Sequence, residues 1–205
     1  MVFSHKGCIK KKRGNVKMKM LMLLSDGFEE TEAVAPADII IRGGVNVEIC
    51  SITGKNILIG THNIKILADS VLPEYIDACA AKEIEIKYDG VILPGGQPNA
   101  TTLQNDERVI EIVKAFYDAG KITSAICASP CVLEKAGLLT GKKATSYPGC
   151  INPESCGEYT DDRAVRDGIV ITGKAAGTAI DFGIEILRGL GLTKEADTVR
   201  AQIYY

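Results

Sequence analysis

The chain has no tryptophan and only two histidines, His5 and His62, in 205 residues. It contains seven cysteines but no C-x-x-C pair. Zinc sites draw on histidines and paired cysteines, so this composition argues against a zinc site. An odd number of cysteines in a chain long enough for a large core also argues against a disulfide-stabilised secreted protein. We therefore expect free thiols, a reducing cytoplasmic compartment, and no metal or other cofactor.

Long hydrophobic runs are also missing. No run approaches the roughly 20 apolar residues of a membrane span, so no membrane partner is expected. The run Met20–Leu24 leads directly into Ser25-Asp26-Gly27, which makes it too short for a secretory signal and typical of a buried strand. No G-x-G-x-x-G motif opens a helix and no P-loop is present, which argues against nucleotide binding.

Charge is unevenly distributed along the chain. The sequence has 24 basic and 26 acidic residues, and residues 1–20 contain seven of the basic residues and no acidic one. The remainder therefore has 17 basic against 26 acidic residues. A nucleic-acid-binding domain usually carries its basic charge on the folded surface, so no nucleic-acid partner is expected. We expect residues 1–17 to be a disordered basic extension and residues 18–205 to be one domain.

Apolar runs alternate with helical periodicities along the body of the chain. This alternation predicts parallel strands joined by right-handed crossovers, with helices on both faces of the sheet. Ligands bind such a sheet at the carboxyl ends of its strands, which points to loops 25–31, 94–99 and 127–130. The expected strands are 18–24, 45–52, 88–93, 122–126 and 168–172, with a β excursion over 56–67, and the expected helices are 30–42, 74–81, 106–119, one from about 129, 178–190 and 193–203.

Cys127 follows the predicted strand 122–126 and precedes a predicted helix. A residue at such a turn presents its side chain at the edge of the sheet, as in a nucleophile elbow. The helix N-terminus is expected to favour the thiolate and to lower the pKa of the thiol below about 8.5. A buried structural cysteine fits this position equally well. Cys131, one helical turn later, is expected to be a core residue rather than a resolving thiol.

Two further loops contribute candidate groups. Gly95 and Gly96 follow a predicted buried strand, and their N–H groups, with that of Ala128, could form an oxyanion hole beside the sulfur. Acids in the first turn of a helix are usually caps or dipole partners, but Glu32 precedes the apolar run 33–37 and is expected to point inward. A carboxyl buried beside a thiolate would have a raised pKa and could act as a general acid or base.

Four motifs in order resemble the ThiJ/PfpI superfamily, specifically the branch of the Parkinsonism-associated deglycase and its bacterial YajL relatives. The resemblance covers about residues 19–202. It implies a flavodoxin-like three-layer sandwich, similar to class I glutamine amidotransferases, and a homodimer. It also implies that Cys127 is the family cysteine and Glu32 its pocket glutamate. The motifs are Asp26-Gly27-Phe28-Glu29-Glu30-Thr31-Glu32-Ala33, Leu93-Pro94-Gly95-Gly96, Ala125-Ile126-Cys127-Ala128-Ser129-Pro130 and Ala176-Gly177-Thr178-Ala179-Ile180-Asp181-Phe182.

The resemblance implies a cofactor-free glyoxalase or protein deglycase that acts on methylglyoxal, glyoxal or their adducts and protects against oxidative stress. The alternative is a redox-sensing chaperone without physiological turnover, in which Cys127 becomes oxidised. A thiamine-biosynthesis role finds no supporting residue. A cysteine peptidase is disfavoured, because Ala128 stands where protease-like members have histidine.

Other departures from the family concern the substrate. Tyr147 occupies a pocket position where relatives often carry His or Phe, and it could donate a hydrogen bond to substrate. His62 falls where close relatives carry an arginine that reaches across the dimer interface, although a surface hairpin histidine fits equally well. Cys150 lies in the same loop as Tyr147 and could come near the pocket, but it is not expected to be functional.

Overall fold

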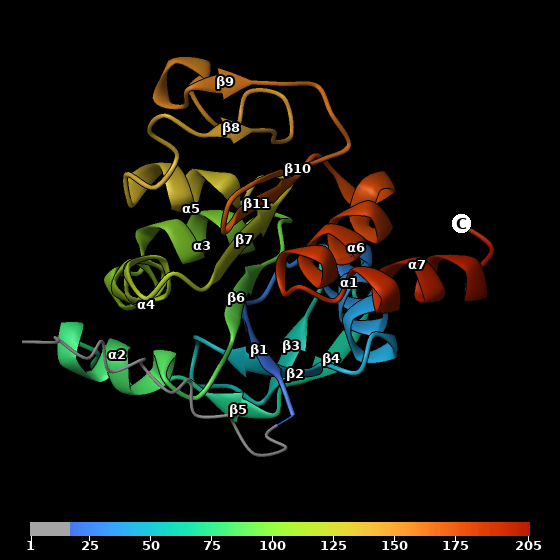
Figure 1. The fold of residues 1–205 in the computed structure, drawn as a ribbon. Coiled ribbons are helices and arrows are strands. Elements are labelled where there is room, and N and C mark those ends of the chain that lie inside the picture. The colour runs from blue at the N-terminus through green and yellow to red at the C-terminus, as the bar shows by residue number, and fades with distance from the viewer. Residues whose placement is uncertain (1–16) are drawn as a thin grey trace, which may run out of the picture.

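The computed structural model describes residues 17–205 (Figure 1). The basic extension predicted for residues 1–17 therefore lies outside the described residues, apart from Lys17. The central sheet is built from seven strands: β1 (Lys19–Leu24), β2 (Asn46–Ser51), β5 (Ser70–Val71), β6 (Gly90–Leu93), β7 (Ile122–Ile126), β10 (Ala164–Asp167) and β11 (Val170–Gly173).

The strand order is β10-β11-β7-β6-β1-β2-β5. Every pairing in this sheet is parallel except that of β10 with β11. Because parallel strands require crossover connections, helices lie between them in the sequence and cover both faces of the sheet. The predicted mostly parallel, flavodoxin-like α/β sandwich is confirmed.

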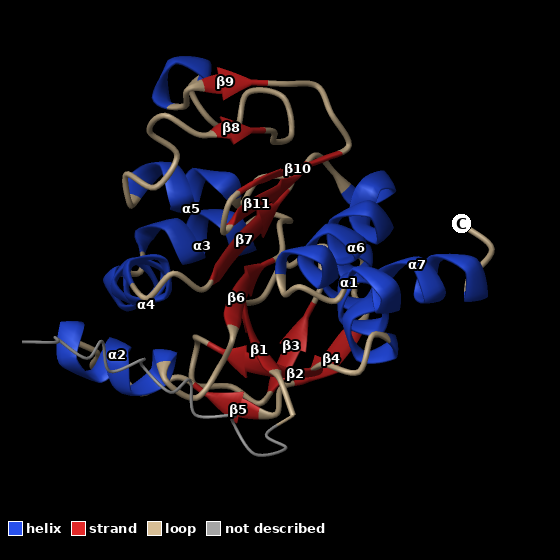
Figure 2. Cartoon of the chain, in the orientation of Figure 1, coloured by secondary structure: helices blue, strands red, loops and turns tan. Residues whose placement is uncertain are grey.

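Two helical layers enclose the sheet (Figures 1 and 2). One layer contains α1 (Glu30–Arg42), α6 (Ala179–Gly189) and α7 (Thr193–Gln202), and the other contains α2 (Ala78–Glu85), α3 (Asn99–Asn105), α4 (Glu107–Asp118) and α5 (Pro130–Lys135). Two short pairings lie outside the central sheet, the hairpin of β3 (Ile57–Ile59) with β4 (Lys65–Leu67), and β8 (Lys143–Ala144) with β9 (Glu158–Tyr159).

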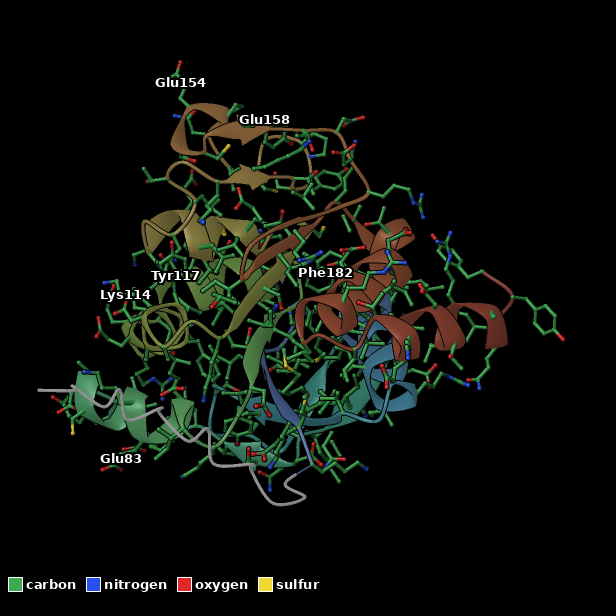
Figure 3. All side chains as sticks on the ribbon, in the orientation of Figure 1. Glu83, Lys114, Tyr117, Glu154, Glu158 and Phe182 are labelled. Atoms are coloured by element: carbon green, nitrogen blue, oxygen red, sulfur yellow. The ribbon has the colours of Figure 1, made fainter. Side chains whose placement is uncertain are left out.

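Strand β1 shows how the sequence fills both layers. Its side chains alternate, so Leu21 and Leu23 pack with the α2–α5 layer while Met20 and Met22 pack with the α1, α6 and α7 layer. Phe182 of α6, labelled in Figure 3, is fully buried between the sheet and the layer of α1, α6 and α7. Charged residues such as Lys114 lie at the periphery of the same view. A strand that is buried on both faces reads as a continuous apolar run, which is why it was visible in the sequence.

Two helices differ from the prediction. The helix expected at 74–81 begins at Ala78 instead, because the side chain of Asp77 accepts hydrogen bonds from the N–H groups of Cys79 and Ala80 and so caps it there. Helix α3 was not predicted, and only its first residue, Asn99, fell within the loop singled out at 94–99. None of the helices in residues 17–205 is both long and apolar enough to span a bilayer.

Candidate active site

The three loops singled out in the sequence meet at one edge of the sheet. Strands β1, β6 and β7 are neighbours, and each ends at this edge. The N–H of Gly95 donates to Glu32 Oε2 at 2.9 Å, and the N–H of Glu29 donates to the carbonyl of Gly95 at 3.0 Å. The hydroxyl of Ser129 donates to the carbonyl of Pro94 at 2.6 Å. The structure therefore brings Glu32 and Cys127 together around the Pro94–Gly96 turn.

Cys127 occupies a strained backbone conformation. Its φ is 64°, a left-handed value that non-glycine residues rarely adopt. The conformation is held by the N–H of Cys127, which donates to the carbonyl of Gly173 at 2.9 Å, and by the N–H of Tyr147, which donates to the carbonyl of Cys127 at 2.8 Å. The side chain is half-buried. Strain of this kind persists only where the surroundings fix it, and it is common at nucleophile elbows.

Glu32 lies in the first turn of α1 and is fully buried. The side chain of Glu29 caps the helix by accepting the N–H of Glu32 at 2.7 Å. Within the described residues, the second carboxyl oxygen of Glu32, Oε1, has no hydrogen-bond partner. A buried acceptor without a donor is costly, and a proton on the carboxyl would remove its charge and let it donate to the neighbouring sulfur of Cys127.

Gly95 is the contact point between the two functional side chains. A Cβ added at this position would lie 2.6 Å from Glu32 Oε2 and 2.8 Å from the Cβ of Cys127. At Gly96, where φ is 87°, an added Cβ would lie 2.3 Å from the backbone nitrogen of Glu29. Both glycines are therefore required by the close approach of neighbouring loops.

The electrostatics of the pair differ in part from the prediction. Burial, assisted by the charge of Glu29, raises the pKa of Glu32 to about 7, against the opposing effects of Cys127 and the N–H of Gly95. A raised pKa was expected. Burial followed by the Glu32 carboxylate also raises the pKa of Cys127, whereas the N–H of Ala128 lowers it.

The prediction that the helix N-terminus lowers the pKa of Cys127 is wrong. Helix α5 has only six residues, and its weak dipole does not offset the burial of the sulfur. Because both anions are costly to bury, the thiol and the carboxyl of Glu32 form a coupled pair that retains one proton around neutral pH.

The predicted oxyanion donors are only partly available. The N–H of Gly95 is occupied by Glu32 and cannot serve a substrate at the same time. The N–H groups of Gly96 and Ala128 make no backbone hydrogen bond within residues 17–205, and that of Ala128 interacts with the sulfur. Tyr147 adjoins Cys127 through its backbone, and the residue is 52% exposed.

His62 lies on the turn between β3 and β4, and its side chain is 68% exposed. Its Nδ1 is 2.8 Å from Glu30 Oε2, and its backbone N–H donates to Glu30 Oε1 at 2.6 Å. Burial alone would raise the pKa of Glu30, but these bonds lower it overall, and the pair raises the pKa of His62. The polar contacts of His62 are thus made with Glu30, and its predicted reach across a dimer interface stays a prediction.

Among the described residues, Glu29, Glu30 and His62 are the group whose ligand atoms come within 4.8 Å of one another. Both oxygens of Glu30 already accept hydrogen bonds from His62, and Glu29 accepts one from Glu32. These contacts explain the cluster as an ion pair beside a helix cap.

Asn99, the first residue of α3, was missed in the sequence. Its fully buried side chain accepts the N–H of Ser25 at 2.7 Å and donates to the carbonyls of Pro94 and Gly95 at 2.8 and 3.1 Å. It thereby joins the loop after β1 to the turn that carries Gly95. Pro98 stands at the N-cap of α3 and no side chain caps this helix, so no capping signal marked its start in the sequence.

A cysteine at a strained strand-to-helix turn, beside a buried glutamate on an α/β sandwich, defines a structural class of α/β proteins. Comparison with known proteins gives the family. The family model described as the DJ-1/PfpI family matches residues 18–189. The chain belongs to the DJ-1/PfpI family.

Relatives and solved structures agree with this assignment. Protein DJ-1 homolog A of Arabidopsis thaliana is 33% identical over 183 residues, which is 88% of this chain but 45% of that protein. The Parkinson disease protein 7 homolog of Danio rerio is 31% identical over 90% of this chain and 96% of its own length. The crystal structure of Drosophila melanogaster DJ-1beta superposes with a TM-score of 0.79 at 28% identity, covering 92% of this chain and 98% of that chain.

Proposed function

We propose that the protein is a cofactor-independent glyoxalase that converts methylglyoxal or glyoxal to the hydroxy acid, and that it acts as a deglycase on their protein adducts. The observation that carries the proposal is the fully buried carboxyl of Glu32, with a pKa of about 7, beside the strained thiol of Cys127. A general base is most effective when its pKa lies near the working pH.

The chemistry follows from this pair. The Glu32 carboxylate takes the thiol proton as the sulfur of Cys127 attacks the aldehyde carbon, which gives a hemithioacetal. The N–H groups of Gly96 and Ala128 hold the developing oxyanion. Glu32 returns the thiol proton to that oxygen and, as a carboxylate again, moves the proton of the former aldehyde carbon to the neighbouring carbonyl carbon. The hydroxyl proton passes to the neighbouring oxygen, which leaves a lactoyl thioester on Cys127. Water hydrolyses that thioester, releases lactate and restores the thiol. The aldehyde carbon is oxidised and its neighbour is reduced, so no external redox partner takes part.

The test is methylglyoxal consumption and lactate formation by the purified protein, without glutathione or added metal. Cys127→Ser is compared with Cys156→Ser, which alters a half-buried cysteine on another segment. We expect turnover in the wild type and in Cys156→Ser and none in Cys127→Ser. Equal turnover in Cys127→Ser would refute the proposal.

A redox-sensing or chaperone role is the second candidate, because Cys127 is half-buried rather than sealed in the core. A Toxoplasma gondii DJ-1 structure, similar to this chain at 27% identity and a TM-score of 0.79, is described as oxidized. Selective addition of oxygen to Cys127 by mild peroxide, together with no methylglyoxal turnover, would favour this role.

A homodimer is also proposed, since the surface beside the site carries exposed apolar side chains that a monomer would leave in water. We expect Val34→Asp to convert a dimer to monomers in light scattering, whereas Ile86→Asp, at an exposed apolar residue of α2's C-terminal end, leaves the mass unchanged. Monomeric wild-type protein would contradict this expectation. The exposed residues are Val34 and Ile41 on α1 and Ile57, Ile59, Ile64 and Leu67 on the β3–β4 hairpin.

A further inference from the structure

The loop that carries Cys150 crosses the start of α5 and is fixed at both ends. At one end, the N–H of Tyr147 donates to the carbonyl of Cys127 at 2.8 Å. At the other end, the N–H of Asn152 donates to the side chain of Glu134, in the last turn of α5, at 2.7 Å. Cys150 lies between these two anchors, so it is placed over the helical turn that connects Cys127 with Glu134.

A tight turn keeps Cys150 close to Tyr147, whose N–H is bonded to the carbonyl of Cys127. Pro148 and Gly149 occupy its centre, Gly149 has a φ of 80°, and the N–H of Cys150 donates to the carbonyl of Tyr147 at 3.1 Å. These features fit a type II turn, whose ends lie within about 7 Å of each other. An added Cβ on Gly149 would meet no heavy atom within 4 Å, so this part of the turn faces open space.

Three thiols share this corner of the molecule. All three thiols are free. The charge of Cys150 raises the pKa of both Cys127 and Cys131, and the Glu32 carboxylate raises the pKa of Cys150. Cys131 is buried in the core on α5 and cannot turn outward without disturbing the helix. Cys150 is half-buried on the loop, so it is the thiol that can approach Cys127.

We propose that Cys150 is a resolving thiol, which captures oxidised Cys127 as an intramolecular disulfide and protects it from irreversible oxidation. The inference rests on the reactive Cys127 thiol of the proposed function and adds a regulation of the same site. A hydroperoxide oxidises the Cys127 sulfur to a sulfenic acid and is itself reduced to water or an alcohol. The Cys150 sulfur then attacks the Cys127 sulfur, an S–S bond forms, the S–O bond breaks, and water leaves. A cellular thiol reduces the disulfide and restores both cysteines.

The full chain is treated with hydrogen peroxide, and its peptides are mapped by mass spectrometry before reduction. A second portion is reduced with dithiothreitol, and the alkylation of Cys127 is then measured. In the wild type we expect a Cys127–Cys150 crosslink and recovery of alkylation by dithiothreitol. In Cys150→Ser we expect sulfinic acid at Cys127 and a recovery about fivefold lower. Cys150→Ala should behave as Cys150→Ser does, and Cys156→Ser, which changes another cysteine nearby in sequence, should behave as the wild type.

Three results would overturn the proposal. One is equal sulfinic acid in the wild type and Cys150→Ser, with no crosslink in either, which leaves the reactive thiol of the proposed function intact. The second is a crosslink from Cys127 to Cys131. The third is a Cys127 that neither gains oxygen nor forms a crosslink, which would also remove the reactive thiol on which the proposed function depends.

Discussion

Replacing Glu32 by glutamine should make the protein more stable at alkaline pH while it removes activity. The pKa of Glu32 is raised from its ordinary 4.5 to about 7 by burial. Because the pKa of the folded state exceeds that of the unfolded chain, the associated stability is fully present below pH 4.5 and is lost as the pH rises through 7. The difference between the two values corresponds to about 3 kcal/mol of unfolding free energy. Glutamine keeps the volume of the side chain and cannot ionise.

Urea unfolding of wild type and Glu32→Gln at pH 5 and pH 8.5, at one protein concentration, measures this effect. We expect Glu32→Gln to be more stable by about 1 kcal/mol at pH 5 and by about 3 kcal/mol at pH 8.5. Glu83→Gln, at an exposed glutamate of α2, is the control and should show no such dependence. A gap that is equal at both pH values, or a mutant that is less stable at pH 8.5, would refute the reasoning.

Two further substitutions test how the site is held. Gly95→Ala places a methyl group 2.6 Å from Glu32 Oε2, so we expect the rate of Cys127 alkylation to fall and the free energy of unfolding to drop by about 1–3 kcal/mol. The control is Gly177→Ala, where an added Cβ meets nothing within 4 Å, and it should change neither quantity. If Gly95→Ala leaves both quantities unaltered, the contact is contradicted. Asn99→Ala leaves buried groups on both neighbouring loops without partners, so urea unfolding should show that the free energy of unfolding falls by about 2 kcal/mol or more. Asn105→Ala, at an exposed residue at the other end of α3, should lower it little. Equal losses in the two variants would count against the bridging role of Asn99.

The sequence was informative where residues follow simple rules of burial. Glu32 was expected to point inward because it precedes an apolar run, and it is fully buried. Cys127 was placed at the end of a strand, and the strand predicted at 122–126 has those bounds in the structure. The parallel sheet followed from alternation alone, and this alternation brought loops that are distant in sequence to one edge.

Other features depend on tertiary contacts that no local pattern reveals. The N–H of Gly95 was expected to face a substrate, but only the folded structure shows that Glu32 occupies it. The direction of the Cys127 pKa depends on how deeply the sulfur is buried, which a turn motif does not specify. Asn99 was overlooked because its role depends on Ser25, a hydrogen-bond partner that lies 74 residues away in the sequence.

The central claim is that Cys127 and Glu32 act as one proton-sharing pair. The most direct test is the pH dependence of Cys127 alkylation by iodoacetamide, in wild type and in Glu32→Gln. Loss of the first proton from the pair leaves the Glu32 carboxylate beside the neutral thiol, where it can take the thiol proton as the sulfur is alkylated, so the wild-type rate should rise with a midpoint near pH 7 and then level off. In Glu32→Gln that step should vanish, and the rate should keep rising toward higher pH. The same midpoint in both proteins would contradict the account.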